Sequence, residues 1–433
     1  MRRFLPVLLL ALALSGMAAP VRQTLPNGLR LLTVPSATSP VVSIEMLIDC
    51  SAFDEPWQLL GIRQVLLTSM LQGSAITDGT AIRRSMAAVG GIIEGRVQQD
   101  TLEISVTVPA DSLALGLNAL AEIVCRPQLS DAGIQAAVLE TEREAAMPPS
   151  GSMETASWAM NDALYADHPY ARRGHASAET LAQLSPQLLR FAYQYFIRPD
   201  YTVMSVVGRC DQAKVNSLST ALFSEWPQGK AREPQASGAS RTLEASRLVL
   251  REAPVQSTCV MMSFPVCGAT QQDFLTLRVI DALLGGGTGS RLFRTIREQQ
   301  HLAYEVATQL PMLVHESTFS LYAITHSRYV DDTKAALVAE ISKLQVEAIS
   351  SGELARAKAY LKGRHLLGHQ SSAQYAYDLA WDEMMGLGAD YDEHLAKKID
   401  AVTADDVQRI ARKYFTHYYL TVVVPLSVVP SAQ

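Results

Sequence analysis

The two halves of the chain end in the same pattern, a capped helix followed by an apolar strand. The first half ends in LSPQLLRFAYQYFIRPDYTVMSVVG, and the second half ends in VTADDVQRIARKYFTHYYLTVVVP. Ser185 and Thr403 occupy the capping position, where a side-chain oxygen accepts a hydrogen bond from a backbone N–H of the first turn. The pattern predicts helices that run to Phe196 and Phe415. A repeat of this kind indicates two similar domains in tandem, each of about two hundred residues.

The halves also begin alike. Strand-like runs LRLLTV and VVSIEMLID open the first half, and RLVLREAP and VQSTCVMMSF open the second. The stretch PQGKAREPQASGAS between them is typical of a linker. We therefore expect an N-terminal domain at 20–226, a linker at 227–240 and a C-terminal domain at 241–433. Neighbouring strand runs followed by blocks of helices favour an α+β class, with an antiparallel-rich sheet and helices packed on one face in each domain.

The N-terminus MRRFLPVLLLALALSGMAAP predicts a secretory signal peptide at 1–19. Arg2 and Arg3 form the charged region, Leu5 to Leu14 form the apolar region, and small residues follow. The apolar run is too short to span a membrane, and no later segment is long enough either. The sequence therefore predicts an exported, periplasmic protein without an integral membrane segment.

Charge and cysteine content exclude some classes of protein. The formal net charge is −6, and the basic residues are scattered, so a nucleic-acid partner is not expected. The chain has five cysteines, an odd number that cannot all pair within one chain. Each lies in or beside an apolar run, which favours buried thiols, although one disulfide is compatible with the sequence.

Three separate segments resemble the insulinase/pitrilysin family of zinc metallopeptidases, which includes the mitochondrial processing peptidase subunits. They are QTLPNGLRLLTVP near the N-terminus, DALYADHPYARRGHASAETLAQLSPQLLRFAYQYFIRPDYTVMSVVG in the first half, and LLGGGTGSRLFRTIREQQHLAYEV in the second. The three segments have the family's order and spacing, and the resemblance spans nearly the whole chain after the signal peptide. The resemblance implies two peptidase-like domains of the fold class expected above.

The resemblance also implies a zinc-binding helix with the inverted motif H-x-x-E-H. The segment GIRQVLLTSMLQGS aligns with this helix, but Gln64 and Thr68 stand where the histidines belong, and Leu67 replaces the catalytic glutamate. Glu142, which follows Thr68 by 74 residues, matches the third ligand. Gln and Thr are poor zinc ligands, and Leu cannot act as a base. The first histidine of the chain is His168, so the N-terminal domain cannot contain the motif.

Two further positions around this site differ from the family pattern. Gln135 replaces the usual acidic companion of the third ligand. On the strand that lines substrate in the family, Glu94 and Gly95 replace an Asn-Ala pair. The sequence therefore predicts a degenerate site without a bound metal, and Glu142 alone is typical of a solvated helix residue.

The second half keeps Arg297 and Tyr304 in RTIREQQHLAYEV. In the family an Arg and a Tyr in this segment reach towards the bound peptide, where the Arg can hold a carbonyl and the Tyr hydroxyl can support developing charge. The alternative is that Arg297 is an ordinary surface residue and that Tyr304 begins a core strand.

The resemblance implies a non-catalytic subunit of a heterodimeric zinc metallopeptidase. A homologous partner would bind the zinc, this chain would carry no cofactor, and the pair would enclose and cleave short or unfolded peptides. One alternative is a stand-alone peptide-binding or holdase-like protein. Another is a relocated metal site at His365 and His369, one helical turn apart, although the sequence shows no third ligand.

The glycines of GGGTGSR lack the phosphate-loop pattern and predict a tight turn between helices.

Overall fold

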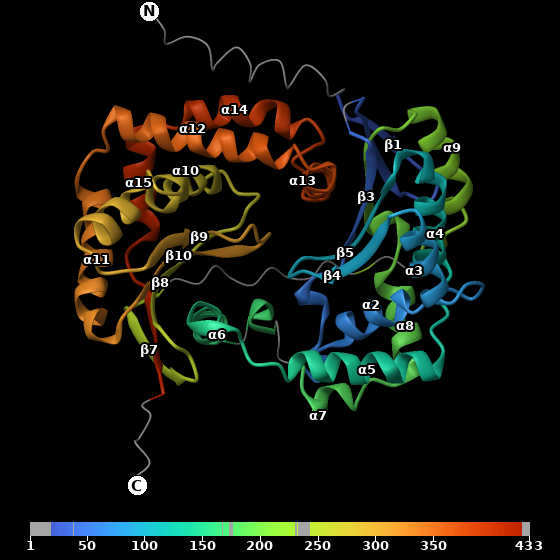
Figure 1. Ribbon diagram of the computed structural model, residues 1–433, viewed down its shortest axis with the longest axis horizontal. Helices are drawn as coiled ribbons and strands as arrows, with labels where there is room; N and C mark the ends of the chain where they lie inside the picture. Colours follow the sequence, from blue (N-terminus) through green and yellow to red (C-terminus); the bar gives the residue numbers. More distant parts are fainter. Residues whose placement is uncertain are drawn as a thin grey trace, which may run out of the picture. The chain divides into compact units, whose positions relative to one another are not determined.

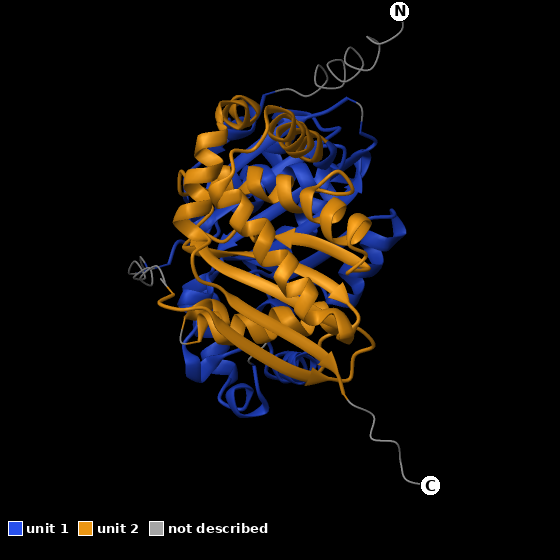
Figure 2. Cartoon of the chain, turned by 90° about the vertical axis from the view of Figure 1, so that its left-hand side faces the viewer, with its two compact units in different colours: residues 1–146, 172–235, 367–393 blue, residues 147–171, 236–366, 394–433 orange. Residues whose placement is uncertain are grey.

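The computed structural model describes residues 19–37, 39–166, 168–172, 176–229, 232 and 243–426. The chain forms two compact units (Figure 2). Unit 1 comprises Met1–Ala146, Arg172–Gln235 and Leu367–Glu393, and unit 2 comprises Met147–Ala171, Ala236–Leu366 and His394–Gln433. The predicted signal peptide, except Ala19, and most of the predicted linker lie outside the described residues.

Unit 1 contains a six-stranded sheet with the order β1-β2-β6-β3-β5-β4. All neighbouring strands are antiparallel except β2 and β6, which are parallel. The strands are β1 (Val21–Thr24), β2 (Arg30–Pro35), β3 (Val41–Asp49), β4 (Ile92–Val97), β5 (Thr101–Pro109) and β6 (Thr202–Gly208).

Unit 2 contains a five-stranded sheet that repeats this topology without the first strand. Its order is β7-β11-β8-β10-β9, and Figure 1 labels β7, β8, β9 and β10. The parallel pair β7 and β11 matches the pair β2 and β6. The strands are β7 (Arg247–Ala253), β8 (Thr258–Cys267), β9 (Glu305–Gln309), β10 (Glu316–Thr325) and β11 (Tyr419–Pro425). The repeat at the ends of the two halves is therefore a repeat of whole sheets.

The helices begin and end close to the predicted positions. Ser185 accepts a hydrogen bond from the Leu188 amide, with Pro186 at the first helical position, and Thr403 forms a capping box with Asp406. The helices are α2 (Ile62–Leu71), α3 (Gly79–Ala88), α4 (Leu113–Cys125), α5 (Asp131–Ala145), α6 (Gly151–Tyr165), α7 (Ala178–Leu181), α8 (Pro186–Phe196), α9 (Gln212–Phe223), α10 (Phe274–Gly285), α11 (Val330–Val346), α12 (Ser351–Gly368), α13 (Ser372–Met384), α14 (Tyr391–Ala401) and α15 (Ala404–Tyr414).

Alternation along β3 places the two faces of the first sheet in different surroundings. Val42, Ile44, Met46 and Ile48 are fully buried in the core that α2, α4 and α8 cover. Burial of each such side chain stabilises the fold by about 1.5–3 kcal/mol. This arrangement confirms the predicted α+β class, an antiparallel-rich sheet whose core helices α2, α4 and α8 pack on one face.

Each sheet also carries one helix on its second face, and this helix comes from the other half of the sequence. In unit 1, α13 packs across β3 and β6, and the Ser205 hydroxyl donates to the Ala376 carbonyl at 2.5 Å. In unit 2, α6 packs on β7, β8 and β11, and His168, just after α6, lies 3.6 Å from Glu316. The two halves therefore exchange a helix, which ties each unit to both parts of the chain.

The face beneath α13 holds a buried acid. Glu45 is 3% exposed, and burial, with a smaller contribution from nearby Glu103, raises its pKa to about 9. Glu45 is therefore protonated in the folded protein at neutral pH. Because its pKa is raised from 4.5, its contribution to stability is present at low pH and is lost as pH rises towards 9.

We expect the Glu45→Gln variant to lack this pH dependence. Wild-type stability should fall between pH 5 and 9 by at most about 1.4 kcal/mol per pH unit relative to the variant. Urea unfolding at several pH values measures the difference, and Glu179→Gln, at an exposed position on α7, is the matched control. Parallel stability curves for wild type and Glu45→Gln would contradict this assignment.

The cysteines and the helix lengths bear on two predictions made from the sequence. None of the five cysteines forms a disulfide, and Cys50, Cys259 and Cys267 are buried. Burial raises the pKa of the Cys50 thiol to about 12, so this thiol is unreactive. Among the described residues, every helix is too short or too polar to cross a bilayer.

Candidate functional site

Helix α2 carries the positions of the zinc motif, and a buried ion pair fixes its start. Arg63 donates to Glu55 at 3.3 Å, to the Cys50 carbonyl at 2.9 Å and to the Gln98 carbonyl at 2.8 Å. The other Glu55 oxygen accepts from the Gly61 amide at 2.8 Å. Gly61 has φ +98°, a conformation that favours glycine. The family-like frame of this helix is thus intact although its ligands are absent.

The polar positions of α2 face helix α5, which carries Glu142. The two helices pack together in unit 1, and Gln64, Thr68 and Glu142 are all half-buried. Gln64 Nε2 donates weakly to Glu144 Oε2 at 3.4 Å, and Glu144 follows Glu142 by two residues. Burial, followed by repulsion from Glu140, raises the pKa of Glu144. The structure therefore brings the two expected helices together, and a hydrogen bond between Gln64 and Glu144 joins them.

Leu67, at the position of the catalytic glutamate, is a core residue. It is 1% exposed, and its side chain lies directly over Gly95 of β4. A Cβ atom added at Gly95 would lie 2.8 Å from Leu67 Cδ1 and 3.0 Å from Leu71 Cδ1, which is closer than carbon atoms normally approach. Two departures from the family pattern, Leu67 and Gly95, are thus complementary, because the missing methyl group of one makes room for the other.

This arrangement cannot perform the family's hydrolytic chemistry. Zinc in proteins requires imidazole, thiolate or carboxylate donors, and α2 offers none of them. No group at position 67 can accept a proton from water. The described site is therefore a packed helix interface rather than an open metal centre.

Arg297 and Tyr304 lie in unit 2, on either side of a bend. Arg297 belongs to a π-helix (η7, Phe293–Gln299), and its guanidinium lies 4.8 Å from the Phe293 ring centre. The Tyr304 amide donates to the Ile324 carbonyl at 2.8 Å, just before β9. The side chain of Tyr304 is 68% exposed, so the alternative of a core residue is wrong. π-helical turns are frequent at functional sites.

His369 has an acidic neighbour that the sequence did not reveal. Its Nε2 atom lies 3.5 Å from Asp392 Oδ1, and its ring lies 4.3 Å from that of Tyr375. His365 lies one turn earlier on α12. Asp392, at the start of α14, belongs to unit 1 together with His369, whereas His365 belongs to unit 2.

The glycine-rich segment after α10 forms a tight turn, as the sequence predicted. Gly287 has φ +76°, and its amide donates to the Gly285 carbonyl at 2.8 Å. The sequence did not indicate that three arginines gather beside this turn. They are Arg291, Arg294 and, much later in the chain, Arg356. Only the density of arginines in SRLFRTIRE signalled a cationic site.

Comparisons with known proteins agree with this geometry. The family model described as "Insulinase (Peptidase family M16)" matches residues 30–173, and the model "Peptidase M16 inactive domain" matches residues 183–361. An uncharacterized zinc protease of Mycobacterium tuberculosis is 24% identical over 93% of this chain and 92% of its own length. Mitochondrial-processing peptidase subunit alpha of Pongo abelii is 21% identical over 90% of this chain and 79% of its own length.

A solved structure shows the same fold. The crystal structure of a protease from Helicobacter pylori matches with a TM-score of 0.83 at 18% identity, covering 94% of this chain and all of that one. Taken with the two family models, which together span most of the described residues, this match is unambiguous. The chain belongs to peptidase family M16, the insulinase family, as a member without the zinc-binding residues.

Proposed function

We propose that this chain is the non-catalytic subunit of a two-chain zinc metallopeptidase. A homologous partner supplies the zinc, and this chain helps to enclose and position short or unfolded peptides. The observation that carries the proposal is a contrast between the two units. Unit 1 fills its zinc site with Leu67 against Gly95, whereas unit 2 leaves Arg297 and Tyr304 exposed to solvent.

Arg297 is suited to hold a peptide carbonyl. Among the described residues its guanidinium contacts only the Phe293 ring, so its N–H groups are available to a ligand. A charge-assisted hydrogen bond from Arg is roughly twice as strong as a neutral one. Stacking on Phe293 orients the guanidinium in advance, which lowers the entropy lost on binding.

Tyr304 offers a hydroxyl near the same segment. Nothing in the described part of the chain accepts its proton, and the backbone amide of Tyr304 is held by β10. The hydroxyl can therefore donate to a peptide carbonyl oxygen or to the negative charge that develops there during cleavage. Zinc chemistry itself is left to the partner.

The relatives support a subunit role. One matched protein is by name the alpha subunit of a processing peptidase, and the match extends over most of this chain. We infer further that the chain is exported, with a signal peptide at 1–19, and acts in the periplasm. Affinity capture of the tagged chain from the periplasmic fraction tests both inferences, because a homologue with an intact H-x-x-E-H motif should co-purify in equal amount.

A further inference from the structure

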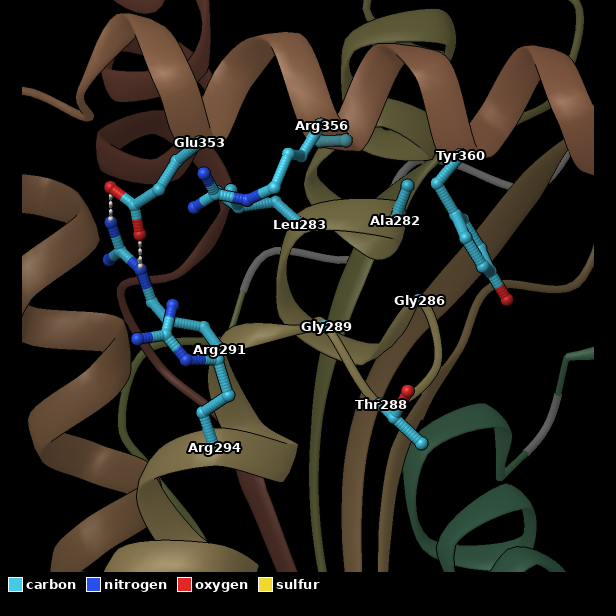
Figure 3. A pocket seen from close by; sticks show the side chains of 11 residues that line it. Ala282, Leu283, Gly286, Thr288, Gly289, Arg291, Arg294, Glu353, Arg356 and Tyr360 are labelled. Carbon is cyan, nitrogen blue, oxygen red and sulfur yellow. Dashed lines mark hydrogen bonds and ion pairs between the residues drawn. The ribbon is translucent and has the colours of Figure 1, made fainter. Parts of the chain in front are cut away.

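Unit 2 contains a cavity of about 220 Å³ between the glycine-rich turn after α10 and the first half of α12. Three arginines line it, Arg291, Arg294 and Arg356 (Figure 3). Its remaining wall includes Leu283 and the ring of Tyr360. We call this cavity the arginine pocket.

The glycines of the turn are required for the shape of this pocket. A Cβ atom at Gly285 would collide with Thr308 on β9. A Cβ atom at Gly286 would lie 2.8 Å from Cδ1 of Tyr360, so the ring can lie against the turn only because residue 286 is glycine. The turn therefore packs closely against β9 and against Tyr360 of α12, and both contacts require glycine.

The arginines outnumber the acids in the pocket. Arg291 donates to both oxygens of Glu353, at 3.1 and 3.3 Å. Although burial alone raises the pKa of Glu353, the hydrogen bonds from Arg291 lower it below its ordinary value, so this carboxylate stays ionised at neutral pH. Figure 3 shows the guanidinium groups of Arg294 and Arg356 extending towards this pair. Neither has an ion-pair partner in the described part of the chain, which leaves two unneutralised positive charges.

The surroundings favour a carboxylate over a phosphate. The glycine-rich turn joins the C-terminus of α10 to the helical segment that begins at Arg291, so helix ends of both signs border the pocket and the helix dipoles do not select the ligand. The planar fork of an arginine matches carboxylates and phosphates alike, but Leu283 and Tyr360 provide apolar surface that suits the side chain attached to an organic carboxylate and not an inorganic phosphate.

We propose that the arginine pocket binds a carboxylate of a peptide, either the C-terminal carboxylate or an acidic side chain. This inference rests on the proposed peptide-binding function. Arg294, which lines the pocket, and Arg297 belong to the same short helix η7, three residues apart. The pocket thus selects acidic or C-terminal segments, and Arg297 holds the adjoining backbone.

Fluorescence anisotropy with matched peptides tests the proposal. The set contains one labelled peptide with a free C-terminus and one internal Asp, its C-terminal amide, and its Asp→Asn form. Removing the carboxylate that the pocket recognises should weaken binding about tenfold. If the C-terminal amide binds more weakly, the C-terminus is the recognised group; if the Asp→Asn form binds more weakly, the Asp side chain is. Arg294→Gln and Arg356→Gln should each weaken binding of the acidic peptide about tenfold and leave the carboxylate-free form unchanged.

The control is Arg364→Gln, an exposed position two turns further along α12 and outside the pocket lining. Equal binding of all three peptides, or an equal loss for Arg364→Gln, overturns the pocket while the proposed function stands. Inorganic phosphate that competes at lower concentration than acetate overturns the choice of carboxylate. If no peptide binds, the proposed function fails. Titration with N-acetylleucine and with its amide then tests by itself whether the arginine pocket binds a carboxylate. Equal binding of the acid and the amide would refute that claim.

Discussion

The triple variant Gln64→His, Leu67→Glu and Thr68→His is expected to lose about 4 kcal/mol of stability in the absence of zinc. Leu67 is fully buried against Gly95, so the glutamate loses apolar burial and places a carboxylate in the core. Urea unfolding with and without a chelator measures this loss. The two new histidines are one turn apart and face the helix that carries Glu142, so added zinc should bind and recover part of the stability.

We expect the metal-loaded triple variant to remain inactive on peptides. Gln135 and Glu94 still differ from the family pattern, and the introduced glutamate enters a site shaped for leucine. Leu67→Met is the matched control and should cost less than about 1.5 kcal/mol, because it conserves volume and polarity. A triple variant as stable as wild type without metal would show that position 67 is not a core position.

Arg297→Ala is expected to lower kcat/KM of the assembled peptidase between about tenfold and a hundredfold. The substitution removes charge-assisted hydrogen bonds worth about 1.5–3 kcal/mol. Tyr304→Phe, which removes only a hydroxyl, should lower kcat/KM by up to about tenfold. Neither variant should prevent assembly, since both side chains are exposed and outside the core. Steady-state hydrolysis of a quenched fluorescent peptide measures the loss, and size-exclusion chromatography measures assembly.

Arg328→Ala is the matched control for Arg297→Ala. Arg328 is also exposed in unit 2 and stacks on an aromatic ring, with its guanidinium 4.5 Å from the centre of Tyr329. This variant should keep wild-type kinetics. Normal turnover by both Arg297→Ala and Tyr304→Phe would remove the active role of this chain and leave only a scaffold.

Features set by neighbouring residues could be predicted from the sequence. Ser185 and Thr403 cap the helices they were expected to cap, because a capping side chain acts within its own first turn. The strands of both halves follow from their apolar runs, and the repeat fixes the shared sheet topology. The resemblance located α2 and α5, which do pack together.

Features set by residues far apart in the sequence could not be predicted. The exchange of α6 and α13 depends on which sheet face the other helices leave uncovered. The apolar and polar residues of α6 and α13 do not show which sheet each helix will cover. The complementarity of Leu67 and Gly95 was visible as two departures from the family, but only their contact shows that they compensate each other. The arginine pocket joins residues 291 and 356 across separate elements of unit 2.

The most direct test is affinity capture of the tagged chain from the periplasmic fraction, at its native expression level, followed by mass spectrometry. We predict an equimolar partner of similar length that carries an intact H-x-x-E-H motif, and zinc in the complex but not in the isolated chain. Recovery of the chain alone, without a homologous partner, would contradict the account. The function would then be peptide binding without cleavage.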